Sequence, residues 1–230
     1  MPFDYVRTPA RTNRNVKRSR SSALAKKSSK RSFKPVRVSI GRNPFPQQLF
    51  NTLTYFDMVS FSVTTGAGTY GFRANGMFDP DYTSTGHQPL YFDQLSAVYN
   101  HWTVLRSRIK ITSCDVQNSE VNYSLVLDDD TSPPATGTGS ERPGASTWGG
   151  NPSIGSSKIV LYQKYDAAKM FGPNPMANDN LQGTSAADPT EQALFFCQAY
   201  VPAASTYGTR LLVEIEYDVV WDELKTIAAS

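Results

Sequence analysis

The sequence predicts an all-β protein: a single antiparallel jelly roll of eight strands, preceded by a disordered basic arm. Three observations predict this class. Aromatic residues make up 12% of the 230 residues, and with many Thr, Ser, Gly and Pro residues they favour strands and turns over helices. Several segments alternate apolar and polar side chains with a period of two residues. Lysine and arginine gather at the amino-terminus, where large apolar residues are scarce.

Residues 1–42 form the first predicted domain, an arm that binds nucleic acid and carries nuclear-targeting signals. They hold 13 Lys and Arg and one acid, a net charge of +12, whereas residues 43–230 hold 10 Lys and Arg against 19 acids, a net charge of −9. The arm has too few apolar residues to order itself by burial, and this asymmetry is typical of a nucleic-acid-binding tail. The predicted phosphate contacts are Arg7, Arg11, Arg14, Lys17, Arg18, Arg20, Lys26, Lys27, Lys30, Arg31, Lys34, Arg37 and Arg42.

Three other interpretations of the arm stay open. Mitochondrial transit peptides are also rich in Arg and Ser and poor in acids, but this arm lacks their apolar face. The segments "VKRSR" and "AKKSSKR" are typical of nuclear-localisation signals, which does not exclude nucleic-acid binding. An inert, solvated tail is the third interpretation.

Residues 43–230 form the second predicted domain, the jelly roll. The clearest strand is 209–224, where apolar and polar side chains alternate and mark a half-buried strand. Residues 93–102 could form a helical turn or two. About eight strands, few helices and long uneven connections favour a β-sandwich or barrel, and a jelly roll suits them best. The segments with strand character are 48–63, 70–78, 101–116, 120–130, 158–171, 191–202 and 209–224.

The connections 128–157 and 172–190 are rich in turn-forming residues, and we expect them to carry outer-surface contacts such as receptor binding. The two cysteines, Cys114 and Cys197, lie in apolar runs and outside any CxxC pattern. We expect two buried free thiols, although the sequence does not exclude a disulfide between them.

The sequence argues against an enzyme. It contains no GxxxxGK, GxSxG or HExxH pattern, and its two histidines, His87 and His101, cannot supply a cupin-like metal centre. A Ser/His/Asp triad stays possible in space, but no spacing supports one. We therefore expect no enzymatic activity and no cofactor. No apolar run approaches the roughly 18 residues of a membrane span, so we expect no membrane insertion.

The segment 76–94, "GMFDPDYTSTGHQPLYFDQ", is dense in ligand-type residues. Asp79, Asp81 and Asp93 offer oxygen ligands and His87 a nitrogen, but Asp-Pro-Asp is more typical of a turn whose carboxylates accept backbone hydrogen bonds. We therefore predict no metal site and keep Asp79 and Asp81 as weak candidates. A second weak candidate is the acidic run Asp128, Asp129 and Asp130.

The stretch "RSRIK" predicts a basic stripe on a strand. Arg106, Arg108 and Lys110 share one face, and Leu105, Ile109 and Ile111 share the other. The apolar face belongs to the core. The basic face can contact nucleic-acid phosphates or an acidic neighbour, and a merely solvated face is the alternative. We include these three cations among the predicted nucleic-acid contacts.

The basic arm, the block "NGMFDPDYTSTGHQPLYFDQLSAVYNHWTVLRSRIKI" (75–111) and the late strand "LLVEIEYDVVW" (211–221) resemble capsid proteins of small circular single-stranded DNA viruses that encode a replication initiator, relatives of circoviruses. The resemblance implies a jelly roll whose roughly sixty copies close into an icosahedral shell. It implies an arm that points inward onto a single-stranded DNA genome and engages the host nuclear import machinery. The protein is then expected in the virion and, during assembly, in the host nucleus.

For the segment 76–94, the same resemblance implies an ordered loop followed by a short helix. Gly76, Pro80, Gly86 and Pro89 are expected to fix its turns. We predict that three aromatic residues anchor the loop on its own subunit or at a neighbouring subunit, and we expect Phe92→Ala to prevent assembly. These predicted interface residues are Phe78, Tyr91 and Phe92.

Three alternative functions remain at this stage. A monomeric or small-oligomer nucleic-acid-binding β-protein would share the arm but stay small in solution. A jelly-roll coat protein of an RNA virus would have the same features, because the charge of the arm cannot distinguish DNA from RNA. A jelly-roll enzyme with a transit peptide is the third, and the scarcity of histidine argues against it.

Overall fold

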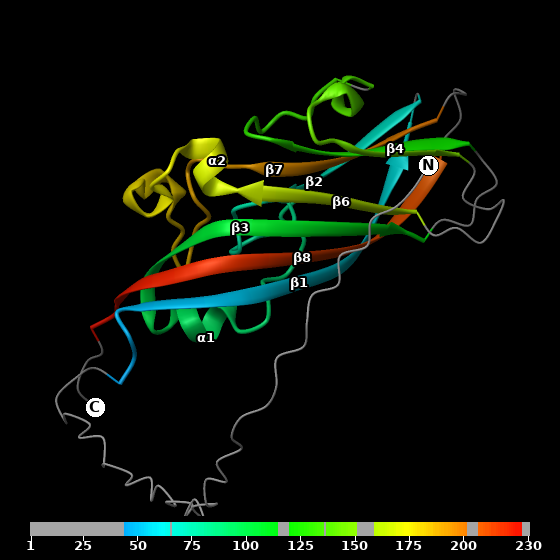
Figure 1. The fold of residues 1–230 in the computed structure, drawn as a ribbon. Coiled ribbons are helices and arrows are strands. Elements are labelled where there is room, and N and C mark those ends of the chain that lie inside the picture. Colours follow the sequence, from blue (N-terminus) through cyan, green and yellow to red (C-terminus); the bar gives the residue numbers. More distant parts are fainter. Residues whose placement is uncertain are drawn as a thin grey trace, which may run out of the picture. The chain divides into compact units, whose positions relative to one another are not determined.

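Two four-stranded antiparallel sheets make up the body of the protein in its computed structural model (Figure 1). The predicted all-β jelly roll is confirmed. The predicted arm lies outside the described residues, so the domain division at residue 42 stays a prediction. The structure describes residues 44–64, 66–114, 120–135, 137–150, 159–201 and 207–226.

The first sheet has the strand order β1-β8-β3-β6. β1 pairs with β8 along its whole length without a register shift, and Figure 1 shows the two strands side by side with β3. The expected strand 48–63 coincides with β1. The strands are β1 (Gln48–Val63), β8 (Tyr207–Leu224), β3 (Tyr99–Ser113) and β6 (Val160–Asp166).

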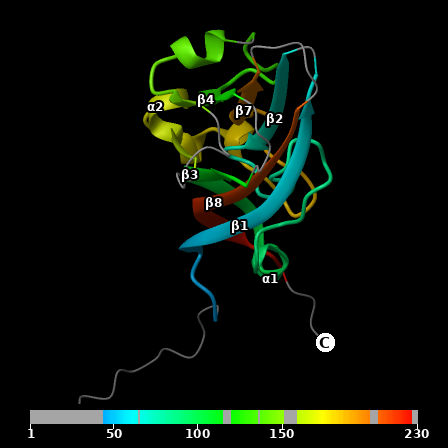
Figure 2. The same ribbon diagram turned by 90° about the vertical axis from the view of Figure 1, so that its right-hand side faces the viewer.

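The second sheet has the order β2-β7-β4-β5 and forms a separate layer (Figure 2). Between them the two sheets pair β1 with β8, β2 with β7, β3 with β6 and β4 with β5. This pairing results when a long hairpin of eight strands folds over on itself, which gives a jelly roll. The strands are β2 (Ala67–Arg73), β7 (Leu194–Tyr200), β4 (Val121–Asp128) and β5 (Ser146–Gly150).

The core lies between the sheets and is rich in aromatic side chains. The alternation predicted for β8 is confirmed, because its inward-facing residues are at most 2% exposed. Phe92 lies between two tryptophans, with ring centroids 5.9 Å from Trp102 and 5.7 Å from Trp221. The buried inward residues of β8 are Leu211, Val213, Ile215, Tyr217, Val219 and Trp221.

Helices are few and short. The helical turn expected after the 76–94 segment is α1 (Phe92–Ser96), and α2 (Ala167–Phe171) occupies the end of the segment 158–171, which the sequence predicted as strand throughout. The side chain of Asp166 accepts a hydrogen bond from the backbone N–H of Lys169 at 3.3 Å and caps α2. Three 3₁₀ turns complete the helices: η1 (Thr138–Glu141), η2 (Pro175–Ala177) and η3 (Asp179–Leu181).

A β-bulge in β3 corrects one detail of the predicted basic stripe. The register between β3 and β8 shifts between Val104 and Arg106, so two successive residues lie on the same side of the sheet. Leu105 therefore lines an outer groove with Phe50 rather than sharing the inner face with Ile109. Ile109 is buried as predicted.

The expectation for the cysteines is confirmed in part. Cys114 and Cys197 form no disulfide, and Cys197 is buried, but Cys114 is exposed where β3 ends. Among the described residues, no helix is both long enough and apolar enough to cross a membrane.

Candidate functional site

The basic stripe of β3 lies on the outer face of the first sheet, as the sequence predicts. Arg106, Arg108 and Lys110 are all exposed. Two of them are paired with carboxylates of the neighbouring strand β8: Arg108 Nε lies 2.9 Å from Glu216, and Lys110 Nζ lies 3.2 Å from Glu214. The stripe thus faces an acidic partner within its own chain.

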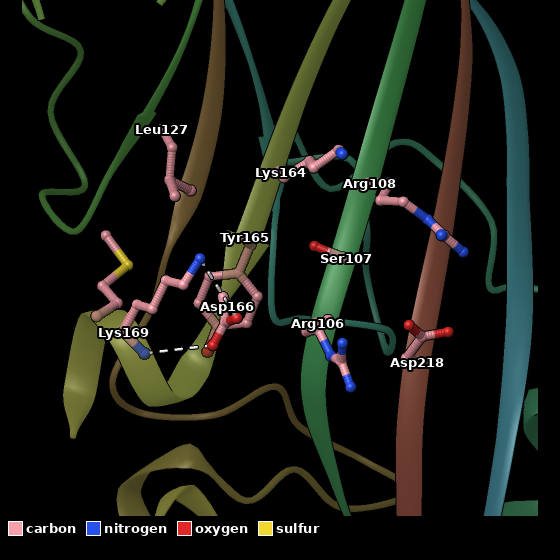
Figure 3. Close-up of a pocket in the computed structure, with 10 residues that line it drawn as sticks. Arg106, Ser107, Arg108, Leu127, Lys164, Tyr165, Asp166, Lys169 and Asp218 are labelled. Atoms are coloured by element: carbon pink, nitrogen blue, oxygen red, sulfur yellow. Dashed lines mark hydrogen bonds and ion pairs between the residues drawn. The ribbon is translucent and has the colours of Figure 1, made fainter. Parts of the chain in front are cut away.

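The third cation of the stripe lies beside a cavity of about 440 Å³ at the junction of β3, β6 and α2 (Figure 3). Arg106 is in register with Asp218 on one side and with Asp166 on the other. Figure 3 shows Arg106 and Arg108 together on β3, with Asp218 on the adjacent strand. The ion pair of Lys169 with Asp166, 4.0 Å long, closes the opposite rim.

Carboxylates accompany the cations across the whole of this outer surface. We call it the ladder face: three successive outward rows of the first sheet, at the level of the β3 cations. It carries four cations and four carboxylates, so its formal charge is zero. Its charged residues are Arg106, Arg108, Lys110, Lys164, Asp166, Glu214, Glu216 and Asp218. A neutral surface attracts a polyanion much less than an isolated basic stripe would.

The segment 76–94 is built around Arg73, a residue that the sequence did not single out. The Arg73 guanidinium lies 3.3 Å from Asp79 and 3.4 Å from Asp188, and it is stacked over the ring of Tyr82. Asp188 in turn accepts hydrogen bonds from the backbone N–H groups of Phe78 and Asp79, at 2.9 and 3.2 Å. These contacts fix the start of the segment to the strand before it and to the distant connection 172–190.

Burial raises the pKa of Asp188 above its usual value, and the nearby Arg73 guanidinium lowers it in part. The side chain of Asp188 is 8% exposed and that of Arg73 12% exposed. Both charged groups have therefore lost most of their hydration, and each is stabilised by the other instead. The pair supports the structure of the loop. Arg73 and Asp188 lie far apart in the sequence, so no short sequence motif predicts that they pair.

Asp81 lies in a turn and accepts several hydrogen bonds within it. Its carboxylate accepts hydrogen bonds from Tyr70 Oη at 2.7 Å and from both the backbone N–H and Oγ1 of Thr83 at 2.8 Å. The backbone around it covers the edge of β2, since the Arg73 N–H donates to the Pro80 carbonyl and the Tyr82 N–H donates to that of Gly71. The turn interpretation of Asp-Pro-Asp thus fits the structure.

Both glycines of the segment allow close packing. A Cβ atom on Gly76 would lie 2.7 Å from Arg73 Cδ and 2.8 Å from an Asp188 oxygen, and one on Gly86 would lie 2.8 Å from Tyr55 Oη. His87 then joins the loop to the first sheet, with its Nε2 3.0 Å from the Phe56 carbonyl oxygen. The segment therefore links the edges of both sheets.

Among the described residues, no group of three or more His, Cys, Asp or Glu side chains is placed to hold a metal ion. Within the acidic run at the end of β4, Asp128 is buried and lies 2.7 Å from Arg142, whereas Asp129 and Asp130 are exposed. This ion pair fastens the connection after β4 to the second sheet.

The three predicted interface aromatics lie in different environments. Phe92 is 1% exposed, inside the core of its own chain, so it offers no surface to a neighbour, and its predicted interface role is corrected. Phe78 is partly buried, with its ring centroid 6.5 Å from that of Phe92. Tyr91, in contrast, is 62% exposed, next to Leu90 at 71%.

No protein-family model matches the sequence, and no curated protein is significantly similar to it. Among solved structures, several virus structures show a weak likeness to this chain. Desmodium yellow mottle tymovirus has 11% identity and a TM-score of 0.44 over 100% of both chains. Cocksfoot mottle virus has 13% identity and a TM-score of 0.47, covering 76% of this chain and 94% of its own. Tobacco necrosis virus has 12% identity and a TM-score of 0.45, with 79% and 85% covered.

These likenesses correct the predicted lineage. The resemblance to circovirus relatives predicted a single-stranded DNA virus, whereas the viruses with a similar arrangement are RNA viruses. We therefore withdraw the circovirus-like assignment and the single-stranded DNA genome that came with it. At such low identity and TM-score, the likeness assigns neither a family nor a function to this chain.

Proposed function

We propose that this chain is the coat-protein subunit of an RNA virus, a non-enzymatic protein that assembles into a closed shell and holds the genome through its basic arm. The observation that carries the proposal is the joining of two opposite charges in one chain: a segment 1–42 of net charge +12 and a jelly-roll body of net charge −9. A polyanion attracts the first and is repelled by the second. We have withdrawn the assignment to a single-stranded DNA virus. The remaining coat-protein alternative from the sequence is that of an RNA virus.

The chemistry of the arm is counterion release. Each phosphate that a Lys or Arg neutralises frees a bound cation, so binding weakens as salt concentration rises. If all twelve net charges engaged a single strand, log K would fall against log salt with a slope of about −8. Nuclear targeting by the same arm stays a prediction of the sequence.

Assembly is supported by the apolar side chains that the body leaves in solvent. Phe50, Phe56 and Met58 on β1 are 66%, 53% and 59% exposed, and Leu90 and Tyr91 form a second exposed pair. Exposed apolar groups gathered in this way mark surfaces that contact other proteins.

The test is size-exclusion chromatography of the full chain after nuclease treatment, with absorbance at 260 and 280 nm and electron microscopy of the early fraction. We expect uniform closed shells whose protected nucleic acid, once released, is degraded by ribonuclease and resists deoxyribonuclease. Protected DNA would refute the genome type. A small species that binds oligonucleotide and releases it in salt would favour the runner-up, a nucleic-acid-binding β-protein.

A further inference from the structure

The pairing register of the first sheet defines the ladder face row by row. Across the order β1-β8-β3-β6, the upper row is aromatic, acidic, basic and aromatic: Phe56, Glu214, Lys110 and Tyr162. The middle row is Thr54, Glu216, Arg108 and Lys164, and the lower row is Thr52, Asp218, Arg106 and Asp166. The acids therefore form one column on β8 and the bases a column beside it on β3.

The charge pattern of the ladder face is self-complementary: it can pair with the same face of a second copy. A two-fold axis parallel to the strands and midway between β8 and β3 brings the face of a second copy onto the first and reverses the column order. Every row keeps its level, because the axis runs along the strands. The acidic column then faces the basic column of the other copy, and the basic column faces the acidic one.

The outer columns fit the same arrangement. Phe56, 53% exposed, comes to face Tyr162 of the second copy, which is 58% exposed, and the symmetry makes this contact twice. Aromatic pairs of this kind add to the apolar area that they bury. In the middle row, Thr54 comes to face Lys164, so no like charges meet there.

The other way of stacking the two faces is unfavourable. A two-fold axis across the strands at the level of the middle row places each column on itself, with Glu216 against Glu216, Arg108 against Arg108 and Glu214 against Asp218. Like charges brought together at an interface cost several kcal/mol. The charge pattern thus selects one orientation of the two copies.

We propose that the ladder face is a self-contact surface at which two copies of this chain pack face to face about that axis. The inference rests on the proposed function, since a shell of identical copies is held by contacts between like subunits, and an isologous contact must be self-complementary. In the contact, Arg108 would lie between its own Glu216 and that of the other copy. A neutral face with alternating charges suits a second copy better than it suits a polyanion.

The size of the face sets the strength of the contact. At ordinary strand spacing it covers roughly 400 Å² per copy, below the about 800 Å² per partner of a standard interface. The contact is therefore weak between two free subunits and gains its stability from the other contacts of the shell.

The test is a swapped variant with Arg108→Glu, Glu216→Arg, Lys110→Glu and Glu214→Lys. It keeps the net charge, the pairs within each chain and the complementarity of a copy to itself. Only a mixed contact suffers, because in the upper and middle rows each charged residue of the wild-type columns then faces a residue of like charge. Wild-type and swapped chains with different affinity tags are co-expressed, and capture through one tag is followed by quantification of the other.

We expect both proteins to form particles alone, and mixed capture to fall at least fivefold below that of a wild-type pair with the same two tags. Mixing at the control level would overturn the contact while leaving the proposed shell intact. A folded swapped variant that forms no particles would also overturn it. Absence of particles from the wild-type chain counts against the proposed function instead, and cross-linking then tests the contact on its own.

The cross-linking test needs no change to the charged columns. Thr54→Cys and Lys164→Cys are made in separate chains, each with Cys114→Ser, because Cys114 is an exposed thiol whereas Cys197 is buried. Faces packed about 10 Å apart bring the two new thiols within reach of a bis-maleimide of similar length. We expect a cross-linked dimer from the mixture and much less from either variant alone. Equal yields, or none from the mixture, would overturn the contact.

Discussion

Two sets of ion pairs in this molecule have the same chemistry and opposite surroundings. Around Arg73, the side chains of the cation and of Asp188 are 12% and 8% exposed. On the ladder face, Arg108 and Glu216 are 51% and 42% exposed. The first set is surrounded by its own chain, whereas the second is open to whatever approaches the sheet.

The difference shows that buried charged side chains support the fold, whereas exposed ones remain available to bind another molecule. A buried ion pair loses its water and cannot lose one partner without a large penalty, so the Arg73 pairs serve the shape of the 76–94 segment. An exposed pair contributes little to stability and is available for binding. The weak metal candidates Asp79 and Asp81 lie in the first region, and three of the predicted nucleic-acid contacts, Arg106, Arg108 and Lys110, lie in the second.

The largest effect is expected from Phe92→Ala, in the core below the 76–94 segment. Removing a buried phenyl ring from between Trp102 and Trp221 should lower the free energy of unfolding by about 3–5 kcal/mol. Thermal unfolding followed by circular dichroism measures it. Tyr91→Ala, at the exposed neighbouring position, is the matched control and should change stability by no more than about 0.5 kcal/mol. A small effect of Phe92→Ala would place this ring outside the core.

Asp188→Ala should have the next largest effect, about 3 kcal/mol, because it leaves the buried Arg73 guanidinium with one carboxylate fewer. Asp188→Asn should be milder, since an amide oxygen still accepts the backbone hydrogen bonds of Phe78 and Asp79. Urea unfolding of both variants makes the comparison. If Ala and Asn were equally harmless, the Arg73 cluster would not hold the loop.

Asp188 also predicts a pH dependence. Its pKa is raised in the folded state, chiefly by burial, so the folded protein binds a proton that the unfolded chain has already released. Its contribution is fully present below the ordinary Asp pKa of 3.8 and is lost as the pH rises through the raised pKa. Unfolding free energies across this window should therefore fall more steeply with pH for the wild type than for Asp188→Asn. Parallel curves would contradict the shift.

The smallest effect is expected on the ladder face. Arg108→Ala should change the free energy of unfolding by about 0–1 kcal/mol, because its partner Glu216 is exposed and solvated without it. Chemical denaturation measures it, with Glu216→Ala as the companion variant. If Arg108→Ala lowered the free energy of unfolding by as much as Asp188→Ala, the ion pairs of the ladder face would support the fold. The two regions would then not differ in the way described.

Local patterns predicted the regular strands well. The segment 48–63 gave β1 with both ends, and the alternation in β8 identified the residues that face the core. β5 was missed because its five residues, Ser146–Gly150, include two glycines and follow a turn-rich stretch. The bulge at Leu105 was missed because register depends on the partner strand.

The candidate site was predictable only in part. The basic stripe of β3 follows from the period of two, but the β8 carboxylates that pair with it lie about a hundred residues further along the chain. A similar separation along the chain is the reason that the pairing of Arg73 with Asp188 could not be predicted. Phe92 was assigned to an interface because an aromatic residue in a loop looks alike in sequence whether it faces a neighbour or its own core.

The pairing of β1 with β8 also sets an order of events during synthesis. β1 leaves the ribosome early, but its neighbour in the sheet follows at least 144 residues later, counted from Val63 to Tyr207. At ordinary elongation rates this is a delay of roughly 10–30 s. During that time the apolar side chains of β1 have no sheet to join, while the basic arm has already emerged. A nascent chain can thus meet RNA before its own fold is complete.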